Sequence, residues 1–501
     1  MGFDFGTSTT LIASANGIID IGQESAGHLS AAWMPSVAAV TDDGTTVVGE
    51  EATLQVPEQT ARSIKRSITE GRTVVRLDTP TGFRDVRTDD LMVEVFREAM
   101  RRAVATRTDV ATATDLRLGC PAMWDGRQRR RLLDIAQRAG MPVGLDSLVD
   151  EPVAAGIAWL AYADVSTVVP KRVLVFDLGG GTLDVAVLEV RGRRRPELAV
   201  LAAIGVAEAG DALDDAIAED LASVLAVRGV DMDSLDNPAR ARTRLTFAAR
   251  EAKEGLSVTQ EHAAVLPKRQ FGVADVWYTR AQLEQVFADQ MDRAEQTVIT
   301  ALKVARMTEG TSESAYTIMQ TPVEELTRTI DVVVLSGGMT RIPYVKQRLQ
   351  ELFGPRTRIE VADIAPDTAV ALGLARAGSY GRINMYRPAF DVLLEWEDEL
   401  RTVYDAFTPL VAPGMIARGG ADLRYARNGL DLLLPRKGEG RLRVVPQDGA
   451  KVRASLNGRN LDGFTVALSE QRFEFRIYPN GRIHLTDATG SFDGQIDGWH
   501  N

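Results

Sequence analysis

The sequence predicts an α/β protein of two related lobes that face each other across a cleft, followed by a small all-β unit. Strand-like runs alternate with helical patterns over about the first 380 residues, a strand–turn–strand motif occurs twice, and short alternating runs replace this pattern near residue 385. With 501 residues, the chain is also longer than one hydrophobic core usually supports, so two or three core-forming units are expected.

The α/β prediction depends on the period of the apolar residues. Residues 173–176 and 331–335 are mostly apolar and rich in β-branched side chains, which is typical of buried parallel strands. Residues 89–103 and 126–139 instead repeat apolar side chains at the spacing of one helix face. The first part of the chain therefore alternates strands with helices.

A domain boundary is expected where Gly378, Gly381 and Pro388 interrupt the last helical pattern. Short alternating runs follow, separated by turn pairs such as Asn457-Gly458, and they predict strands at residues 430–434, 442–445, 464–468 and 473–478. The predicted units are a large domain over 1–381, with lobe I at about 1–170 and lobe II at about 171–381, and a β domain over 401–501. Residues 382–400 are either a linker or the first strand of that domain.

Composition excludes several classes of protein. The net charge of -11 argues against a surface built to hold nucleic acid or acidic lipid. The sequence shows no apolar stretch long enough to cross a bilayer, and its N-terminus lacks the pattern of a secretory signal. We therefore expect a cytoplasmic protein that binds neither nucleic acid nor membrane.

The repeated motif spans residues 2–10 and residues 175–184, and each copy has an aspartate, a glycine-containing turn, hydroxyl residues and a second strand. Glycine allows unusual backbone angles and leaves no Cβ, so backbone N–H groups can approach phosphate oxygens. The glycines concerned are Gly6, Gly179, Gly180 and Gly181. One such turn alone could be an ordinary tight turn, but two related turns predict a phosphate-binding cleft.

Oxygen-bearing side chains accompany both turns. Thr7, Ser8 and Thr182 supply hydroxyl groups that can donate to phosphate oxygens. Asp4 and Asp177 each stand at the end of a strand, where they can hold a hydrated Mg²⁺ between the lobes, because this hard cation prefers oxygen ligands.

A third motif, residues 332–343, is an apolar strand that ends in Gly337-Gly338 before a helix. A nucleoside can press against such a backbone, although alone this element could also be a plain strand-to-helix turn. The sequence has no Gly-Lys pair and no Gly-x-Gly-x-x-Gly after a strand, which excludes P-loop and dinucleotide-binding folds.

In this order the three motifs resemble the superfamily of actin, the sugar kinases and Hsp70, and further segments resemble Hsp70 in particular. Those segments are residues 34–37, 48–52, 57–66, 121–129, 150–155, 250–257 and 278–284. The resemblance spans essentially residues 1–380. It implies a two-lobed actin-like ATPase fold with duplicated ribonuclease-H-like lobes, which binds ATP or ADP with Mg²⁺ and also admits K⁺.

The resemblance also implies roles for individual residues. Lys65 would contact the γ-phosphate region, Glu151 would help place Mg²⁺ and the attacking water, Asp177 or Asp184 would assist that water, and Thr182 would touch the γ-phosphate. Such positioning and charge neutralisation are the main requirements of phosphoryl transfer. The Mg²⁺ ligands, through water, would be Asp4, Asp177 and Glu151.

For the nucleoside, the resemblance implies contacts from Lys253, Ser257, Gly337, Gly338 and Arg341. Two residues depart from the family pattern. Met339 stands where the family usually has a small hydroxyl residue, and Arg250 stands where an acidic residue commonly meets the ribose. We still expect ATP, with altered contacts to base or ribose.

The C-terminal part resembles Hsp70 only faintly. Residues 390–395 are similar to the hydrophobic linker of the family, but they suit a strand of the small domain equally well. The residues that follow are too few for a peptide-binding sandwich with a helical lid, so a lidless β unit is expected, which could receive an extended peptide by strand addition. Pro121 and Arg129 resemble the relay between the two domains, or else are a strand-ending proline and a solvated arginine.

The resemblance implies an ATP-hydrolysing chaperone whose nucleotide state is coupled to binding of unfolded protein or peptide segments by the β domain. A J-domain co-chaperone and a nucleotide exchange factor are the implied partners. A regulatory scaffold that binds nucleotide with little turnover is the main alternative. A small-molecule kinase and an actin-like polymer are further alternatives, which sugar phosphorylation and pelleting with ATP would reveal.

Overall fold

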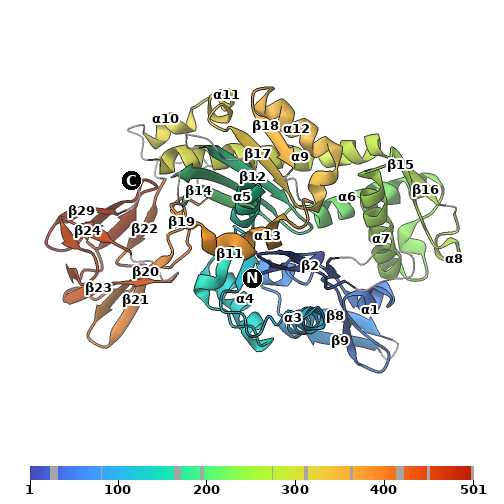
Figure 1. Cartoon of the computed structure of the whole chain (residues 1–501), viewed down its shortest axis with the longest axis horizontal. Coiled ribbons are helices and arrows are strands. Elements are labelled where there is room, and N and C mark those ends of the chain that lie inside the picture. The colour runs from blue at the N-terminus through green and yellow to red at the C-terminus, as the bar shows by residue number, and fades with distance from the viewer. Residues whose placement is uncertain are drawn as a thin grey trace.

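The computed structural model describes residues 1–22, 32–79, 82–162, 171–191, 197–273, 275–309, 314–361, 365–412, 423–447 and 452–497. These residues form two α/β lobes and a C-terminal β unit (Figure 1). Lobe I, coloured blue to cyan, lies below lobe II, and the orange and red strands of the C-terminal β unit lie to the left.

The sheet of lobe I is built on an antiparallel hairpin, β1–β2, to which β10 and β11 add in parallel. The strand order is β11-β10-β1-β2-β3, and β4 also pairs with β2. Phe3 and Phe5 of β1 pack their rings against Phe96 of helix α3 at centroid distances of 5.0 and 4.9 Å. The bounds are β1 (Gly2–Phe5), β2 (Thr9–Ser14), β3 (Gly17–Ile19), β4 (Met34–Pro35), β10 (Arg117–Cys120), β11 (Leu148–Asp150) and α3 (Thr88–Ala105).

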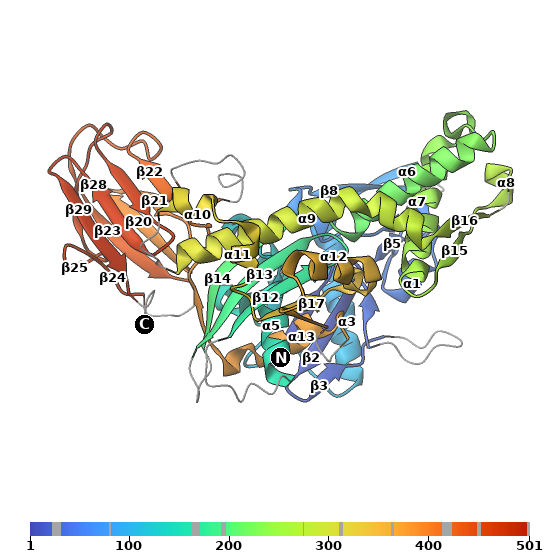
Figure 2. The same ribbon diagram turned by 90° about the horizontal axis from the view of Figure 1, so that it is seen from above.

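The sheet of lobe II repeats this arrangement, because the β12–β13 hairpin is antiparallel and β17 adds to β12 in parallel. Its order is β18-β17-β12-β13-β14-β19. The long helix α9 crosses the back of this sheet (Figure 2). The bounds are β12 (Arg172–Leu178), β13 (Leu183–Arg191), β14 (Glu197–Val206), β17 (Val332–Ser336), β18 (Arg358–Val361), β19 (Gly381–Asn384) and α9 (Arg280–Thr308).

Two helices, α5 (Glu151–Tyr162) and α13 (Ala369–Arg376), pack against each other between the lobe sheets (Figure 1). They approach closely at Gly373, where a Cβ would lie 1.7 Å from the carbonyl oxygen of Ala154. Glycine is therefore required at this crossing, since any side chain would force the two helices apart.

Smaller elements extend each lobe beyond its central sheet. In lobe I they are β5 (Ala38–Val40), β6 (Thr46–Val48), β7 (Thr60–Ala61), β8 (Val74–Thr79), β9 (Gly82–Arg87), α1 (Glu50–Thr53) and α2 (Arg66–Thr69). In lobe II they are α6 (Gly210–Val227), α7 (Pro238–Leu256), α8 (Lys268–Phe271), β15 (Glu261–Ala264) and β16 (Val276–Thr279). The remaining helices are α4 (Gly126–Arg138), α10 (Ala315–Met319), α11 (Val323–Thr327) and α12 (Pro343–Phe353).

The C-terminal β unit contains two antiparallel sheets, with orders β21-β20-β23-β26 and β22-β27-β28-β29-β24-β25. Large apolar side chains such as Phe473, Phe475 and Leu485 are fully buried in it. Every element described between residues 390 and 497 is a strand. These are β20 (Phe390–Trp396), β21 (Glu399–Tyr404), β22 (Tyr425–Asn428), β23 (Glu439–Pro446), β24 (Ala454–Leu456), β25 (Arg459–Asn460), β26 (Thr465–Ala467), β27 (Glu474–Ile477), β28 (Arg482–Thr486) and β29 (Ser491–Ile496).

The structure bears on the two alternatives for residues 382–400. Residues 381–384 form β19, which pairs with β14 of lobe II, and residues 390–396 form β20, which pairs with β21 and β23. Between them Met385, Tyr386 and Arg387 are buried. The segment therefore consists of strands joined by a buried connection, and the domain limits given above remain predictions.

Other sequence expectations can be compared directly. The helices expected at 89–103 and 126–139 are confirmed as α3 and α4. The strand expected at 430–434 is wrong, because these residues form a turn in which Leu433 has a positive φ of 54°. Its leucines are apolar enough for a strand, but the backbone bonds locally, from Leu434 N–H to the Gly429 carbonyl at 2.9 Å. In the described part of the chain, no helix combines the length and apolar character needed to span a membrane.

Candidate functional site

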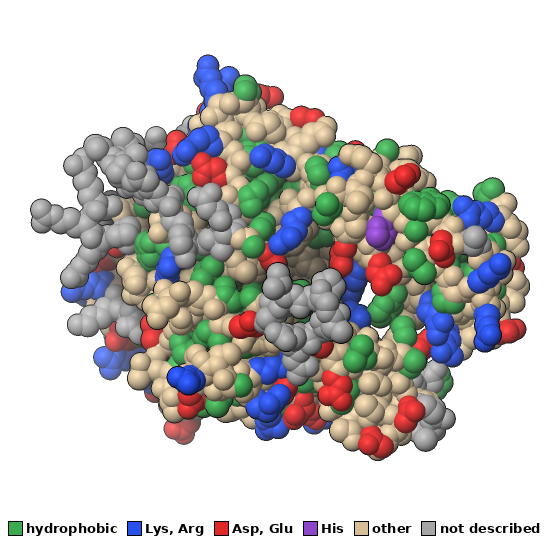
Figure 3. Space-filling model, turned by 45° about the vertical axis from the view of Figure 1, so that its right-hand side comes forward, with side chains coloured by type: hydrophobic (Ala, Val, Ile, Leu, Met, Phe, Trp, Pro, Cys, Tyr) green, Lys and Arg blue, Asp and Glu red, His purple; other side chains and the backbone are tan. Residues whose placement is uncertain are grey.

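A cavity of about 510 Å³ lies between the lobes, within the size range of small-molecule sites. Figure 3 shows the hollow where the lobes meet, with charged side chains along its rim. Residues from all three motifs line it: Asp4, Gly6, Thr7, Ser8, Lys65, Glu151, Asp177, Gly179, Gly180, Thr182, Lys253, Ser257, Gly337, Gly338 and Arg341. Of the site residues predicted from the sequence, Gly181 and Asp184 do not line this cavity, although both lie next to residues that do.

The two glycine turns are closed in the same way. The N–H of Gly6 donates to the carbonyl of Thr9 at 2.9 Å, and the N–H of Gly179 donates to the carbonyl of Thr182 at 3.1 Å. Each turn joins the two strands of its hairpin, β1–β2 in lobe I and β12–β13 in lobe II. The duplication seen in the sequence is thus a duplication of local structure.

The turns also contact each other across the cleft. A Cβ at Gly180 would lie 2.7 Å from Oγ of Ser8, and one at Gly181 would lie 2.6 Å from Oγ1 of Thr7. Only residues without a side chain allow this approach. Hydroxyl groups of lobe I are therefore packed directly against the backbone of the lobe II turn.

Three buried aspartates lie around this contact. Asp177 and Asp184 are cross-strand partners in the β12–β13 hairpin, and Asp184 accepts a hydrogen bond from the N–H of Ala122 in lobe I at 2.7 Å. Burial, reinforced by the nearby charge of Glu151, raises the pKa of Asp4 and that of Asp184 to about 7. Burial and the same carboxylate raise the pKa of Asp177 well above its usual range. Burial therefore disfavours the charged form of all three aspartates, and nearby positive charge would stabilise it.

A lysine supplies part of that positive charge. Nζ of Lys65, which immediately precedes α2, donates to Oε1 of Glu151, the first residue of α5, at 2.5 Å. Burial acts to lower the pKa of Lys65, but the charges of Glu151 and Asp4 outweigh it, and the net shift is upward. Lys65 therefore remains a cation inside the cleft, beside the two glycine turns.

The carboxylates suit a hydrated metal better than a bare one. Among the described residues there is no group of three or more His, Cys, Asp or Glu side chains placed to hold a metal by itself. Mg²⁺ usually retains several waters and takes one or two carboxylates together with substrate phosphates. Asp4, Glu151 and Asp177 line one cavity and offer the oxygen ligands that such an ion requires.

The other end of the cavity is lined by α7 and the third motif. Nζ of Lys253 pairs with Asp214 at 2.6 Å and donates to the carbonyl of Gly210 at 3.2 Å. Arg341, after the paired glycines, pairs with Asp367 at 2.9 Å. Met339, one of the two departures from the family pattern, is buried in the cavity wall and presents a thioether there.

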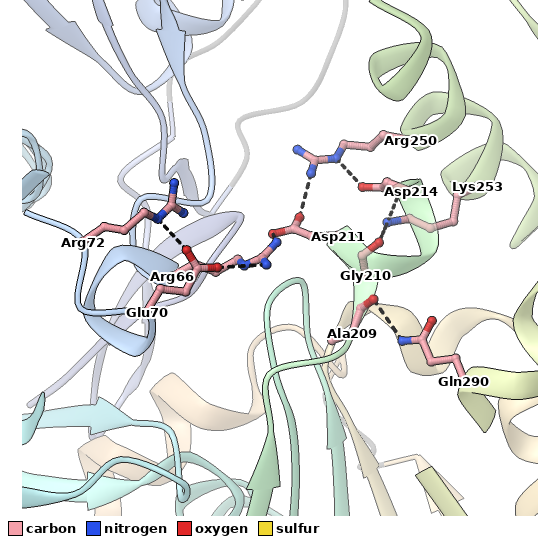
Figure 4. A network of polar contacts seen from close by, with 10 residues as sticks. All are labelled: Arg66, Glu70, Arg72, Ala209, Gly210, Asp211, Asp214, Arg250, Lys253 and Gln290. Atoms are coloured by element: carbon pink, nitrogen blue, oxygen red, sulfur yellow. Dashed lines mark hydrogen bonds and ion pairs between the residues drawn. The ribbon is translucent and has the colours of Figure 1, made fainter. Parts of the chain in front are cut away.

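A network of charges joins the lobes beside the cavity, and the motifs did not predict it (Figure 4). Arg250 bonds Asp214 at 2.8 Å and Asp211 at 2.7 Å, all within lobe II. Asp211 also pairs with Arg66 of lobe I at 3.4 Å. The only local sign in the sequence is the Gly210-Asp211 pair that follows a strand and begins a helix, as in anion-binding turns.

Of the two alternatives for Arg129, the solvated arginine is wrong, because its side chain is 2% exposed. It pairs with Asp150 at 2.5 Å, donates to the carbonyl of Trp124 at 3.0 Å and lies over the ring of Phe407 in the C-terminal β unit, 4.9 Å from its centroid. Position 129 lies in a run of three arginines, so the sequence alone could not separate the buried Arg129 from the half-buried Arg131 and the exposed Arg130. Arg129 and Phe407 mark the contact between lobe I and the C-terminal β unit.

Comparisons with known proteins agree with this geometry. The family model described as "Hsp70 protein" matches residues 1–380. A chaperone protein dnaK from Emiliania huxleyi is 30% identical over 412 residues, which cover 76% of this chain and 60% of the relative. The chain thus spans about 60% of the length of the curated relative it matches.

Proposed function

Because this chain belongs to the Hsp70 family, we propose that it binds and hydrolyses ATP with Mg²⁺, and that the bound nucleotide controls how its C-terminal β unit holds protein segments. The two lobes are those of the actin-like ATPase fold of that family, as the sequence predicted. Proteins of this family are ATPases and chaperones, and the relative found by comparison is named as a chaperone.

The observation that carries the proposal is the meeting of two glycine turns, a buried lysine and several carboxylates in one cavity. The turns offer backbone N–H groups and the hydroxyls of Thr7, Ser8 and Thr182, which suit the β- and γ-phosphates of a nucleotide. We assign the γ-phosphate to the Lys65 side of the cavity, where Lys65 would neutralise charge as the phosphoryl group departs.

The attacking water is assigned to the carboxylates. We propose that Glu151 and Asp177 orient the water and the hydrated Mg²⁺, and that Asp184 holds the hairpin in place through its bond with the Ala122 N–H. A carboxyl with a pKa raised to about 7 can exist in either protonation state near neutral pH. We propose that Asp184, which does not line the cavity itself, assists the water through its cross-strand partner Asp177. When bound, Mg²⁺ would neutralise phosphate charge in this cleft.

The nucleoside is assigned to the wall formed by α7 and the third motif, with Lys253, Ser257, Gly337, Gly338 and Arg341 around it. Arg250 is held by Asp211 and Asp214, which directs its guanidinium toward lobe II carboxylates. We therefore propose that the ribose is bound mainly by Lys253, with little help from position 250. We also propose that the site can bind K⁺ as a further cation.

Coupling to the C-terminal β unit is proposed from the contacts of one segment of lobe I. Residues 120–124 lead from β10 past the Asp184 contact to Trp124, whose carbonyl accepts hydrogen bonds from two buried arginines, Arg129 and Arg387. Arg387 also donates to the carbonyl of Phe407 in the β unit at 3.1 Å. A shift of this segment with the nucleotide would therefore move groups that hold the β unit.

Unfolded protein or peptide segments are the proposed ligands of the β unit, bound in extended form along a sheet edge. A J-domain co-chaperone, a nucleotide exchange factor and a cytoplasmic location are proposed from family membership.

Single-turnover hydrolysis of ATP by the full chain with Mg²⁺, with and without a permanently unfolded protein, tests the proposal. We expect slow hydrolysis that the unfolded protein accelerates severalfold. A Phe407→Ala variant should hydrolyse ATP but lose this response. Tight ATP binding with a rate that never responds to unfolded protein would instead support the regulatory scaffold.

A further inference from the structure

Trp124 connects the proposed catalytic lysine with the C-terminal β unit, and the motifs gave no role for it. Its side chain is fully buried. The centre of its ring lies 5.7 Å from Nζ of Lys65, at a distance where a cation and an aromatic face attract each other. Its indole N–H donates to Oγ1 of Thr69 in α2 at 2.9 Å, which fixes the orientation of the ring.

The backbone carbonyl of Trp124 is bonded by an arginine that also contacts the C-terminal β unit. Nη1 of Arg387 donates to the Trp124 carbonyl at 3.1 Å and to the Phe407 carbonyl at 3.1 Å. Arg387 belongs to the buried connection between β19 and β20, and only 3% of its surface is exposed. A single guanidinium nitrogen thus joins lobe I to the β unit at the residue that contacts Lys65.

Burial of the charged Arg387 side chain is energetically unfavourable. In the described part of the chain its hydrogen bonds go to backbone carbonyls, and its Nε atom has no partner. Burial lowers the pKa of Arg387, the nearby charge of Arg129 adds to this, and the charge of Asp150 opposes it only in part. A buried cation of this kind is stabilised by only a few carbonyls, so loss of the β unit contact would leave it underbonded and favour rearrangement.

We propose that Trp124 is a positioning residue for Lys65. Arg129 of lobe I bonds the Trp124 carbonyl at 3.0 Å, and Arg387 adds a second bond to it that holds only while the C-terminal β unit is docked on lobe I. This inference rests on the proposed function, because it takes Lys65 as the group that neutralises the γ-phosphate. It adds a route from the β unit to the catalytic lysine, through the Arg387 guanidinium, the Trp124 carbonyl and the Trp124 ring.

The route predicts a particular pattern of effects on rate. A displacement of about 1 Å in a positioning group can cost on the order of 100-fold in rate. Trp124→Ala should therefore slow single-turnover hydrolysis by about 10- to 100-fold, with the Kd for ATP changed less than about threefold. Trp124→Phe keeps an aromatic face for Lys65 and loses only the bond to Thr69, so it should recover most of the rate.

We expect Arg387 to affect the rate of hydrolysis through the indole ring of Trp124. Arg387→Met keeps an extended apolar side chain and removes the bonds to both carbonyls, and it should slow hydrolysis by about 10-fold in the wild-type background. In the Trp124→Ala background the same change should have no further effect, because the ring that transmits it is already missing. Arg130→Met is the matched control, since Arg130 faces Asp405 of the β unit at 3.6 Å on the exposed rim and should leave the rate unchanged.

The experiment is a double-mutant cycle on the full chain, with single-turnover hydrolysis of ATP, ATP affinity and thermal unfolding measured for each variant. Non-additive rates with near-constant affinity support the proposal. Additive rates, or a Trp124→Phe variant as slow as Trp124→Ala, would overturn it. If Trp124→Ala unfolds, Trp124→Leu, which fills the site without an aromatic ring, takes its place in the cycle and is judged by the same criterion. Absence of hydrolysis in the wild type would contradict the proposed function instead, so the two failures are distinguishable.

Discussion

Nζ of Lys65 lies 2.5 Å from Oε1 of Glu151, although the two residues are 86 positions apart in the chain. Both side chains are almost fully buried, so each neutralises a charge that would otherwise be costly in the cleft. In the proposed function, Lys65 would turn from Glu151 toward a phosphate when a nucleotide binds. The ion pair would then be the resting arrangement of the empty cleft.

Replacement of this lysine tests its assignment. Lys65→Ala should reduce single-turnover hydrolysis of ATP by about 100-fold or more, because a preorganised charge is lost from a water-poor site. The fold should persist, because Lys65 lines the cavity and is not part of a hydrophobic core. Lys346→Ala, on the exposed face of α12, is the control and should hydrolyse ATP like the wild type. A Lys65→Ala variant with normal turnover would refute the site.

We expect substitutions of Asp177 to weaken Mg²⁺ binding and to leave the fold intact. Asp177→Asn keeps the shape of the side chain and removes its charge, while Asp177→Ala removes both. Each should lower hydrolysis by orders of magnitude, and titration calorimetry should show that Mg²⁺ no longer strengthens ADP binding. Asp289→Asn, on the exposed surface of α9, supplies the control. Wild-type Mg²⁺ dependence in both Asp177 variants would contradict the metal assignment.

The glycine turns could be predicted from sequence because their chemistry is local. In each copy an aspartate, a turn glycine and a hydroxyl residue lie within a few positions, and the turn geometry requires that order. The strands and helices of the lobes could also be predicted from the sequence, since β12 and α3 carry the apolar pattern of a strand or helix along their whole length.

Contacts between distant segments could not be predicted in this way. Arg66 and Asp211 are 145 positions apart, and neither belongs to a pattern that predicts its partner. The nature of residues 390–396 was equally open, because alternating apolar residues suit a linker and a strand alike. Pairing with β23 and β21 makes this segment a strand, and that pairing is set by the whole β unit.

Ion pairs across the cleft should control nucleotide release. Arg66 of lobe I pairs with Asp211 of lobe II at 3.4 Å, and Glu58 of lobe I pairs with Arg240 of lobe II at 2.7 Å. Asp211→Asn and Glu58→Gln should each speed the release of a fluorescent ADP analogue severalfold, since the lobes then separate more easily. The release rate of the wild type should also rise with salt.

A pair that does not cross the cleft provides the comparison. Asp233 and Arg242 both belong to lobe II and are largely exposed, so Asp233→Asn should leave ADP release unchanged. If all three variants release ADP at the wild-type rate, the cleft pairs do not limit release.

Stability of the nucleotide-free protein should depend on pH through the buried aspartates. The pKa of Asp4 and that of Asp184 are about 7 in the folded protein, against an ordinary value of 3.8. The folded state therefore binds more protons than the unfolded state between about pH 4 and pH 7, and stability falls as pH rises through this window. Above about pH 8 both groups are ionised in both states, and their contribution becomes constant.

Denaturant unfolding at several pH values between about 5 and 8 measures this effect. Asp184→Asn should show a shallower fall than the wild type, because one of the titrating groups is removed. Mg²⁺ with ADP should also reduce the slope, since a bound cation stabilises the ionised carboxylates. Parallel profiles for wild type and Asp184→Asn would show that Asp184 does not titrate in this range.

Gly373, where α13 crosses α5, should be among the least replaceable residues of the fold. A Cβ there would lie 1.7 Å from the carbonyl oxygen of Ala154, so Gly373→Ala must force the helices apart. Overpacking of this kind costs typically about 1–3 kcal/mol, and a backbone atom can yield less than a side chain. Glu151 begins α5, so the displacement would also disturb its bond with Lys65. We therefore expect a lower melting temperature and slower ATP hydrolysis together. Gly490→Ala, at a loop position with free space around it, is the control and should change neither the melting temperature nor the rate of hydrolysis. A Gly373→Ala protein as stable and active as the wild type would show that the helices can separate without cost.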